Sequence, residues 1–292
     1  MAKRSSHHNF LKGARVYLSG PMDFVSSRER ERQFGWRARI GQYLDTLGVS
    51  VFDPWKKPQV RGLLEYGRED AVTIEARHRW TFDESAQGAK VRAELAEYFW
   101  KTVHIDLRMV DLSDFVIAYC PTNVYSVGTV HEIIVARQQH KPVLFVSPSV
   151  DFPSLHKLEA ELAGQRSLTQ LLDEIKSELP RKDNPRGVPS LWYMPLIGSE
   201  SFFDGFGFYL GKYHRKFPGW KCASALDERE ARLPPSRSLV PFLESLARGR
   251  NVPKCWDHAA QRHGDDDDWL LLEEALECGS SKPIAEQKKK TF

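Results

Sequence analysis

Two features common in membrane and secreted proteins are missing from this sequence, namely a long apolar run and paired cysteines. No stretch of about 18 apolar residues occurs, and the first ten residues, MAKRSSHHNF, are polar, so we expect neither a membrane-spanning helix nor a signal peptide. The four cysteines, Cys120, Cys222, Cys255 and Cys278, form no C-x-x-C pair, which suits a reducing compartment. The expected protein is therefore cytoplasmic and has no membrane partner.

An excess of charge of one sign is also missing. Lys and Arg together number 42 and Asp and Glu 39, which leaves a formal net charge of +3. This near balance provides no global field for an anionic partner, so we expect no nucleic-acid polymer as a ligand. Hydrophobic residues make up 41% and charged residues 28% of the chain, proportions that are ordinary for a globular protein.

What the sequence does contain is a series of short apolar runs separated by segments of helical period. Four runs are predicted to be strands: 14–20, 48–55, 115–120 and 142–147. Helices are predicted at about 27–47, at 89–114 and after Gly128-Thr129. Apolar strands that alternate with helices indicate an α/β fold, a doubly wound parallel sheet of the flavodoxin/Rossmann-like kind with a C-terminal extension. Ligands of such sheets bind at the carboxyl ends of the strands, near the switch in strand order.

The composition changes towards the C-terminus and defines two regions. We assign residues 12–215 to a catalytic domain, within which residues 56–88 form a polar, irregular excursion. Residues 216–292 alternate turn residues with blocks of charge and are assigned to a charged, partly disordered extension. A short amphipathic helix is predicted there at about 269–276.

A glutamate at the start of a helix is the most informative single residue. The order of elements is a strand, a polar loop, Gly128-Thr129 and then Glu132, which we place in the first helical turn. The helix N-terminus carries partial positive charge and would keep this carboxylate ionised. Gly128 would let a ligand approach the backbone closely. An ionised carboxylate beside a dry pocket is suited to attack an electrophilic carbon.

Several segments together resemble the nucleoside 2-deoxyribosyltransferase-like superfamily, over residues 14–147. They are VYLSGP at the first strand, SDFVIAY, SVGTVHEIIVARQQHKPVLFV, and Asp106 placed 26 residues before Glu132. The superfamily includes nucleoside deoxyribosyltransferases and deoxynucleoside 5′-monophosphate N-glycosidases. The resemblance implies cleavage of the N-glycosidic bond of a deoxyribonucleoside or its 5′-monophosphate, with the sugar passed to another base or to water. It requires no cofactor or metal.

The resemblance also implies roles for individual residues. Glu132 would be the nucleophile that attacks C1′ of the deoxyribose and forms a covalent glycosyl-enzyme. Asp106 would protonate or position the departing base, and Tyr17 would orient the glutamate. Gly20 and Pro21 would shape the sugar pocket.

One position bears on the choice between a nucleoside and a nucleotide. Six residues before the nucleophile the transferases carry an aspartate that meets the sugar hydroxyls, whereas the nucleotide N-glycosidases carry a serine that meets the 5′-phosphate. This sequence has Ser126, and a neutral hydroxyl at a helix N-terminus favours phosphate. Ser26, Ser27 and Arg28 are candidates for further phosphate contacts.

Other candidates for substrate binding have an equally simple structural interpretation. Thr129 follows Gly128 at the helix entrance, and Ser126 fits an ordinary helix cap as well as a phosphate ligand. Asp53 and Trp55 close a strand, so a turn is as reasonable as base stacking by Trp55. Tyr17 alone fits plain strand packing.

Two further hypotheses concern the whole molecule. Members of the superfamily complete their sites with a neighbouring subunit, so a homo-oligomer with shared sites is expected. The aromatic segment 191–211, with Glu200 and Asp204, is the candidate for that contribution. A non-catalytic nucleotide-binding or sensing domain remains the alternative from another class.

Two weaker patterns carry no function. Cys255, His258 and His263, with Cys222, lack the paired spacing of a structural zinc site. GFGFYLG at 205–211 follows no first strand of a βαβ unit and lacks the third glycine at the position that a dinucleotide-binding loop requires.

Overall fold

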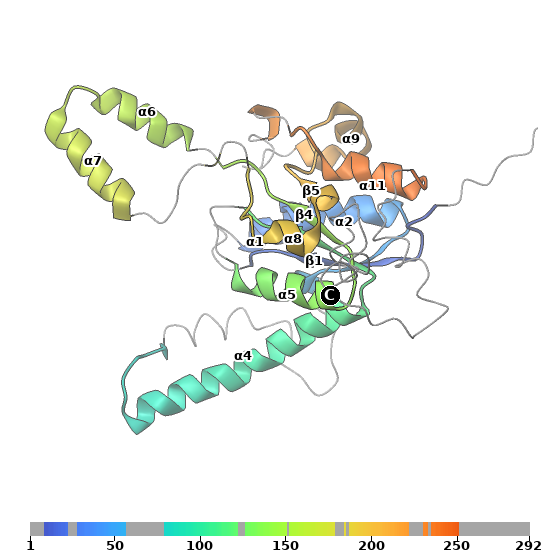
Figure 1. Ribbon diagram of the computed structural model, residues 1–292, viewed down its shortest axis with the longest axis horizontal. Helices are drawn as coiled ribbons and strands as arrows, with labels where there is room; N and C mark the ends of the chain where they lie inside the picture. The colour runs from blue at the N-terminus through green and yellow to red at the C-terminus, as the bar shows by residue number, and fades with distance from the viewer. Residues whose placement is uncertain are drawn as a thin grey trace, which may run out of the picture.

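A five-stranded parallel sheet forms the centre of the molecule (Figure 1). The computed structural model describes residues 9–22, 28–56, 79–121, 126–150, 152–178, 184, 187–221, 230–232 and 235–250. Within them the strands are β1 (Arg15–Ser19), β2 (Ser50–Phe52), β3 (Phe115–Tyr119), β4 (Val143–Val146) and β5 (Phe202–Phe203). Their order is β2-β1-β3-β4-β5, and every neighbouring pair is parallel. This is the flavodoxin-like order, and it confirms the predicted doubly wound α/β class.

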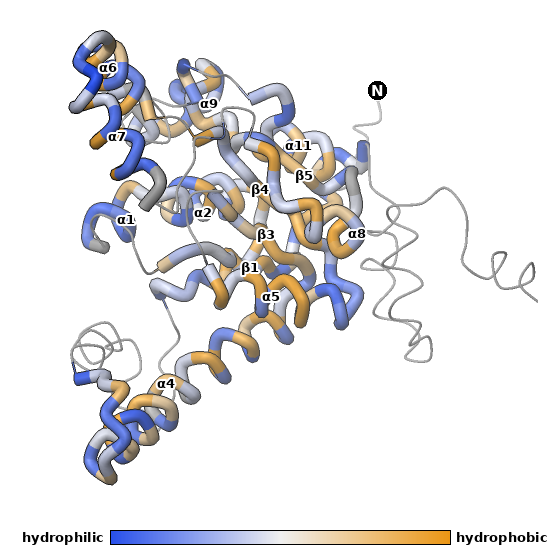
Figure 2. Tube along the Cα trace, turned by 60° about the vertical axis from the view of Figure 1, so that its left-hand side comes forward, coloured by the Kyte–Doolittle hydropathy of each residue, from blue (hydrophilic) through white to orange (hydrophobic). Residues whose placement is uncertain are grey.

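Helices cover both faces of the sheet, because successive side chains of each strand point to opposite sides. Val16 and Leu18 of β1 join a core with α2 (Trp36–Thr46), α9 (Gly211–Lys216) and α11 (Leu239–Ala247). Tyr17 lies between them in sequence and joins the opposite core, with α4 (Ala86–Leu112), α5 (Val127–Gln138) and α8 (Tyr193–Ile197). Figure 2 shows the hydrophobic colour in the interior, around β3 and β4.

Other helices lie at the margins. The helices α6 (Pro153–Leu162) and α7 (Arg166–Glu178) form a hairpin that stands away from the sheet (Figure 1). Single 3₁₀ turns are formed by η1 (Pro54–Lys56), η2 (Ser199–Ser201) and η3 (Pro218–Lys221). Within the described ranges, every helix falls short of the length and apolarity that a bilayer-spanning segment requires.

The single helix predicted at 27–47 is two helices. Helix α1 (Arg28–Phe34) ends where Gly35 adopts an extended backbone, with φ −68° and ψ 174°, and α2 starts at the next residue. A Cβ atom at Gly35 would lie 2.3 Å from the carbonyl oxygen of Glu31, so only glycine fits here. The apolar period of the sequence continues across the break, which is why the periodicity alone does not reveal it.

Residues 239–247 pack into the domain, although the sequence places them in the C-terminal extension. Leu239, Val240, Leu243 and Leu246 of α11 are fully buried in the same core as β1, and Trp220 of η3 joins them. The described part of residues 216–250 thus completes one face of the sheet. The helix predicted at 269–276 lies outside the described residues, as does most of the excursion predicted at 56–88.

The segment 191–211, expected to present aromatic side chains to a neighbouring subunit, contributes largely to this chain's own core. Phe203, Phe206 and Phe208 are buried, whereas Leu191 and Trp192 are 74% and 86% exposed. The carboxylate of Asp204 accepts hydrogen bonds from the backbone N–H groups of Ser236 and Arg237 at 2.7 and 2.8 Å. Asp204 therefore fixes the loop before α11.

The Lys-Pro-Val motif after α5 anchors the C-terminal end of α4. Nζ of the buried Lys141 donates to the carbonyl oxygens of Val110 at 2.6 Å and of Asp111 at 2.5 Å. These are carbonyls that the last turn of a helix leaves without an intrahelical partner. Asp106 lies in the same end of α4, so the anchor holds it against the sheet. The other end of α4 projects away from the domain (Figure 1).

Candidate functional site

Two hydroxyl groups from one strand hold the carboxylate of Glu132. The phenol of Tyr17 donates to Oε1 over 2.7 Å, and the hydroxyl of Ser19 donates to Oε2. Tyr17 and Ser19 are two residues apart on β1, so their side chains point to the same face of the sheet. The structure therefore brings together Tyr17 and Glu132, as the resemblance implies, and adds Ser19, which was not among the expected site residues.

The group lies at the point where the strand order reverses. Ser19 ends β1, and β3, its neighbour on one side, ends at Tyr119, while β2 lies on the other side. Helix α2, after β1, and helix α5, after β3, pack on opposite faces of the sheet, and α5 supplies Glu132. This is the position in which open α/β sheets bind their ligands, and it is the position that the sequence predicts.

The pKa of Glu132 is raised to about 7, first because the side chain is partly buried and then because Asp106 carries a like charge nearby. Hydrogen bonds from Ser19 and Tyr17 and the charge of Arg37 act in the opposite direction. A substantial fraction of the Glu132 carboxyls is consequently protonated at neutral pH.

This protonation corrects the expectation that the helix N-terminus keeps Glu132 ionised. Helix α5 begins at Val127, earlier than predicted, so Glu132 stands in its second turn and the first turn contains no acidic residue. The favourable effect of a helix N-terminus falls off within the first turn. Burial consequently outweighs it.

Asp106 is a third member of the group. Its charge raises the pKa of Glu132, and together with burial and Glu132 it raises the pKa of the Tyr17 phenol. Asp106 thus acts electrostatically on both Glu132 and Tyr17. Tyr17 thus remains a neutral phenol and a hydrogen-bond donor at physiological pH.

A buried arginine shapes the loop that follows β1. Arg37 of α2 is 1% exposed, and its guanidinium donates to the carbonyl oxygens of Leu18 (3.2 Å), Gly20 (2.6 Å) and Pro21 (3.4 Å). Its Nε lies 4.0 Å from Oδ1 of Asp53. Burial lowers the pKa of Arg37, and the charge of Asp53 opposes that effect. The sequence does not reveal this role of Arg37, because a lone arginine within an amphipathic helix carries no local signal of burial.

The residues predicted to shape the sugar pocket are held by this arginine and its neighbour. A Cβ atom at Gly20 would lie 2.8 Å from Cζ2 of Trp36 and 3.2 Å from a guanidinium nitrogen of Arg37. Gly20 is thus required for the close approach of α2 to the end of β1. Pro21 is buried and contributes its carbonyl oxygen.

Asp53 and Trp55 form a turn, which is the simpler of the two interpretations given above for these residues. Oδ1 of Asp53 accepts from the backbone N–H of Trp55 at 2.9 Å, which starts η1. The guanidinium of Arg32 lies over the Trp55 ring, 5.0 Å from its centroid. The buried Asp53 therefore both closes the turn after β2 and faces Arg37.

The entrance of α5 carries two paired hydroxyls and an open glycine. Oγ of Ser126 lies 2.7 Å from Oγ1 of Thr129, and within the described part of this entrance the Ser126 hydroxyl caps no backbone N–H group. Gly128 is exposed, and no described atom lies within 4 Å of the place where its Cβ would stand. Gly128 and Glu132 are four residues apart and share one face of the helix. The exposed Gly128 therefore lies on the same helix face as Glu132, about one turn nearer the N-terminus.

Some candidates lie elsewhere. Ser26 and Ser27, proposed for phosphate contacts, are outside the described residues, while Arg28 begins α1. Cys222, Cys255, His258 and His263 are also outside them. Among the residues that the structure does describe, no cluster of three His, Cys, Asp or Glu side chains could hold a metal ion.

Fold and site together define a class: a doubly wound α/β protein with a hydroxyl-bound carboxylate at its switch point. No family model matches the chain, and no curated protein matches it either.

Proposed function

We propose that the protein cleaves the N-glycosidic bond of a 2′-deoxyribonucleoside or its 5′-monophosphate and transfers the deoxyribosyl group to another base. The observation that supports this most directly is the pair of hydrogen bonds from Tyr17 and Ser19 to the two oxygens of Glu132. They fix the orientation of a carboxylate at the ligand-binding edge of the sheet, as a nucleophile requires.

In the first step, a carboxylate oxygen of Glu132 forms a bond to C1′ while the bond from C1′ to the base nitrogen breaks. The electron pair of that bond leaves with the base, which takes up a proton. Asp106 supplies this proton, because two carboxylates close together favour a state in which one of them is protonated. The productive state has the proton on Asp106 and the negative charge on Glu132.

In the second step, an acceptor attacks C1′ and the ester to Glu132 breaks, returning the electron pair to the carboxylate. Asp106 takes the proton that the acceptor loses. A base as acceptor makes the protein a transferase, and water makes it a deoxynucleoside 5′-monophosphate N-glycosidase, which is the alternative. Both follow the two-carboxylate logic of retaining glycosidases.

The experiment is incubation with each deoxynucleoside and each 5′-monophosphate, with and without a second free base, followed by chromatography of bases and nucleosides. Exchange of one base for another supports the transferase. Release of the base without an added second base supports the hydrolase, in which water is the acceptor. Glu132→Ala should lose activity by on the order of a thousandfold. Glu161→Ala, which changes an exposed glutamate of α6, is the matched control and should retain it.

A slow 2-fluoro sugar analogue should leave a covalent adduct on Glu132, visible by mass spectrometry of peptides. An adduct on another residue, or full activity of Glu132→Ala, would exclude Glu132 as the nucleophile. Binding of nucleotides without any turnover would favour the sensing alternative.

A further inference from the structure

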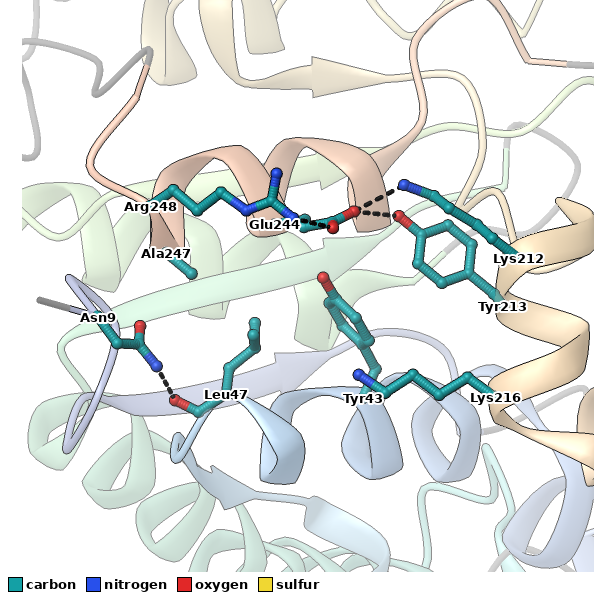
Figure 3. Close-up of a pocket in the computed structure, with 9 residues that line it drawn as sticks. All are labelled: Asn9, Tyr43, Leu47, Lys212, Tyr213, Lys216, Glu244, Ala247 and Arg248. Carbon is teal, nitrogen blue, oxygen red and sulfur yellow. Dashed lines mark hydrogen bonds and ion pairs between the residues drawn. The ribbon is translucent and has the colours of Figure 1, made fainter. Parts of the chain in front are cut away.

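A cavity lies on the other side of the sheet from Glu132. Its volume is ≈ 370 Å³, and it opens between the residue Asn9, the C-terminal half of α2, helix α9 and the last turn of α11 (Figure 3). Tyr43 and Tyr213, which line it, belong to the core on the α2 side, whereas Tyr17 belongs to the opposite core. The cavity is therefore separate from the site described above.

The lining of this cavity carries an excess of positive charge. Lys212, Lys216 and Arg248 line it together with a single carboxylate, that of Glu244. The carboxylate is already engaged, since Oε2 accepts from Nζ of Lys212 at 2.7 Å and from the Tyr213 phenol at 2.9 Å, and Oε1 pairs with Arg248. Figure 3 shows these contacts above the opening. Helices α2 and α11 both end here, and each end contributes about half a negative charge, which leaves the lining positive.

Within the part of the chain that the structure describes, one of the three cations is not paired with a carboxylate. Lys216 is exposed, and among the described residues it makes no ion pair; its ammonium lies 5.5 Å from the centroid of the Phe217 ring. Lys212 and Arg248 share the one carboxylate of Glu244. An anion placed beside Lys216 and Arg248 would therefore gain charge-assisted hydrogen bonds without displacing either ion pair.

The walls of the cavity are aromatic and aliphatic. The rings of Tyr43 and Tyr213 meet edge to face, with centroids 5.9 Å apart, and Leu47 and Ala247 complete the apolar surface. Burial raises the pKa of both phenols, so the two rings remain uncharged at neutral pH. A volume of this size falls within the range of roughly 300–1,000 Å³ that small-molecule sites occupy.

We propose that this cavity binds a small organic anion with a flat apolar body, whose carboxylate or phosphate group meets Lys216 and Arg248. The apolar body lies against Tyr43 and Leu47. The ligand needs both an anionic group and an apolar group. An anionic group alone would leave the apolar walls exposed to water, and an apolar group alone would form no ion pair with Lys216 and Arg248. The site stands on its own residues and does not depend on the activity proposed for Glu132.

Isothermal titration calorimetry of the full chain with phenyl phosphate, benzoate, phenol and inorganic phosphate tests this inference. Phenyl phosphate or benzoate should bind at least tenfold more tightly than phenol and than inorganic phosphate, and the stronger of the two identifies the anionic group. Lys216→Gln should weaken that binding by about tenfold, and Lys216→Glu by more. Lys90→Gln on α4, which removes a lysine far along the chain, is the control and should change nothing.

Phenyl phosphate is also able to enter the site at Glu132. The Lys216 variants therefore show which of the two sites produces the measured heat of binding. Their circular dichroism should match that of the unaltered protein, since Lys216 is exposed. Equal binding to the unaltered protein and to Lys216→Glu would overturn the proposal. So would the absence of binding of both aromatic anions up to ~10 mM, a concentration that corresponds to about 3 kcal/mol of binding free energy.

Discussion

The phenol of Tyr17 and the carboxylate of Glu132 lie 2.7 Å apart, although 115 residues separate them in the chain. The parallel pairing of β1 with β3 and the packing of α5 against both strands bring the two groups together. The phenol stabilises the ionised carboxylate and so lowers the pKa of Glu132. Removing the phenol should therefore change the pH dependence of the site.

Tyr17→Phe should lower activity by roughly ten- to a hundredfold at pH 7. This factor corresponds to the free energy of a hydrogen bond to a charged group. The hydrogen bond lowers the pKa of Glu132, so its loss raises that pKa further above 7. The acidic limb of the profile of kcat/KM against pH should therefore move to higher pH, and the loss should shrink above pH 8.

Ser19→Ala should shift the acidic limb in the same direction, because Ser19 also donates to the ionised carboxylate. Ser19→Thr keeps the hydroxyl and serves as its control. A uniform loss of activity at every pH would mean that these hydroxyls only pack against Glu132.

Glu132→Gln should stabilise the protein at pH 8 but not at pH 4. A carboxyl whose pKa rises from 4.5 to about 7 on folding costs the folded state roughly 3 kcal/mol once it is ionised. The cost is absent below pH 4.5, grows between pH 4.5 and 7, and is complete above pH 7. Thermal unfolding of the unaltered protein and of Glu132→Gln at pH 4 and pH 8 measures this cost. The Tm of the variant should be several degrees higher at pH 8 and equal at pH 4. The same difference at both values would contradict the raised pKa.

Arg37→Met should destabilise the protein by about 3–5 kcal/mol, since it leaves the buried Asp53 without its counter-charge and three carbonyl oxygens without their donor. Urea unfolding gives the free energy. Adding Asp53→Asn should cost less than the sum of the two single changes, because no buried charge then remains unpaired. Strict additivity would show that the two side chains do not interact.

Ser126→Ala should lower kcat/KM for a deoxynucleoside monophosphate by roughly ten- to a hundredfold and leave the nucleoside almost unchanged, if the hydroxyl meets the 5′-phosphate. Ser126→Asp should reverse the preference, because a carboxylate repels phosphate. Thr129→Val is the control, since it removes the hydroxyl that Ser126 contacts and keeps Ser126. Equal losses of kcat/KM on the nucleoside and on the monophosphate would mean that Ser126 only stabilises the loop and does not contact the phosphate.

Trp192→Lys should dissociate the proposed homo-oligomer. Trp192 and Leu191 are adjacent, highly exposed apolar residues of segment 191–211, so their side chains are available to a second subunit. Light scattering should report at least a dimer for the unaltered protein and a smaller species for the variant. A monomer that is fully active would refute the shared site.

The sequence predicts the central strands because apolar runs are local signals, whereas the pairing of Tyr17 with Glu132, 115 residues apart, is implied only by the resemblance to a known superfamily. Apolar runs such as FVIAY at 115–119 are recognisable without knowing what covers them. By contrast, β5 consists of only two residues, Phe202 and Phe203, and depends on its pairing with β4. A strand of that length has no period that a sequence could show.

Ser19 and Arg37 could not be assigned for a related reason. Ser19 acts through a carboxylate 113 residues away, and Arg37 acts through the carbonyl oxygens of residues 18, 20 and 21. Neither contact follows from the residue type. The spacing of Ser19 from Tyr17 on one strand was a usable signal, since side chains two apart share a face.

The late position of α11 has a consequence for synthesis on the ribosome. The side chains of Val16, Leu18, Ile117 and Leu144 lie on the face that α11 helps to cover. About 100 residues separate the end of β4 from the end of α11, which at ~5–20 residues per second takes roughly 5–20 s to translate. During that interval the nascent sheet carries an incompletely covered apolar face, so newly made chains are candidates for chaperone binding until residue 247 has emerged.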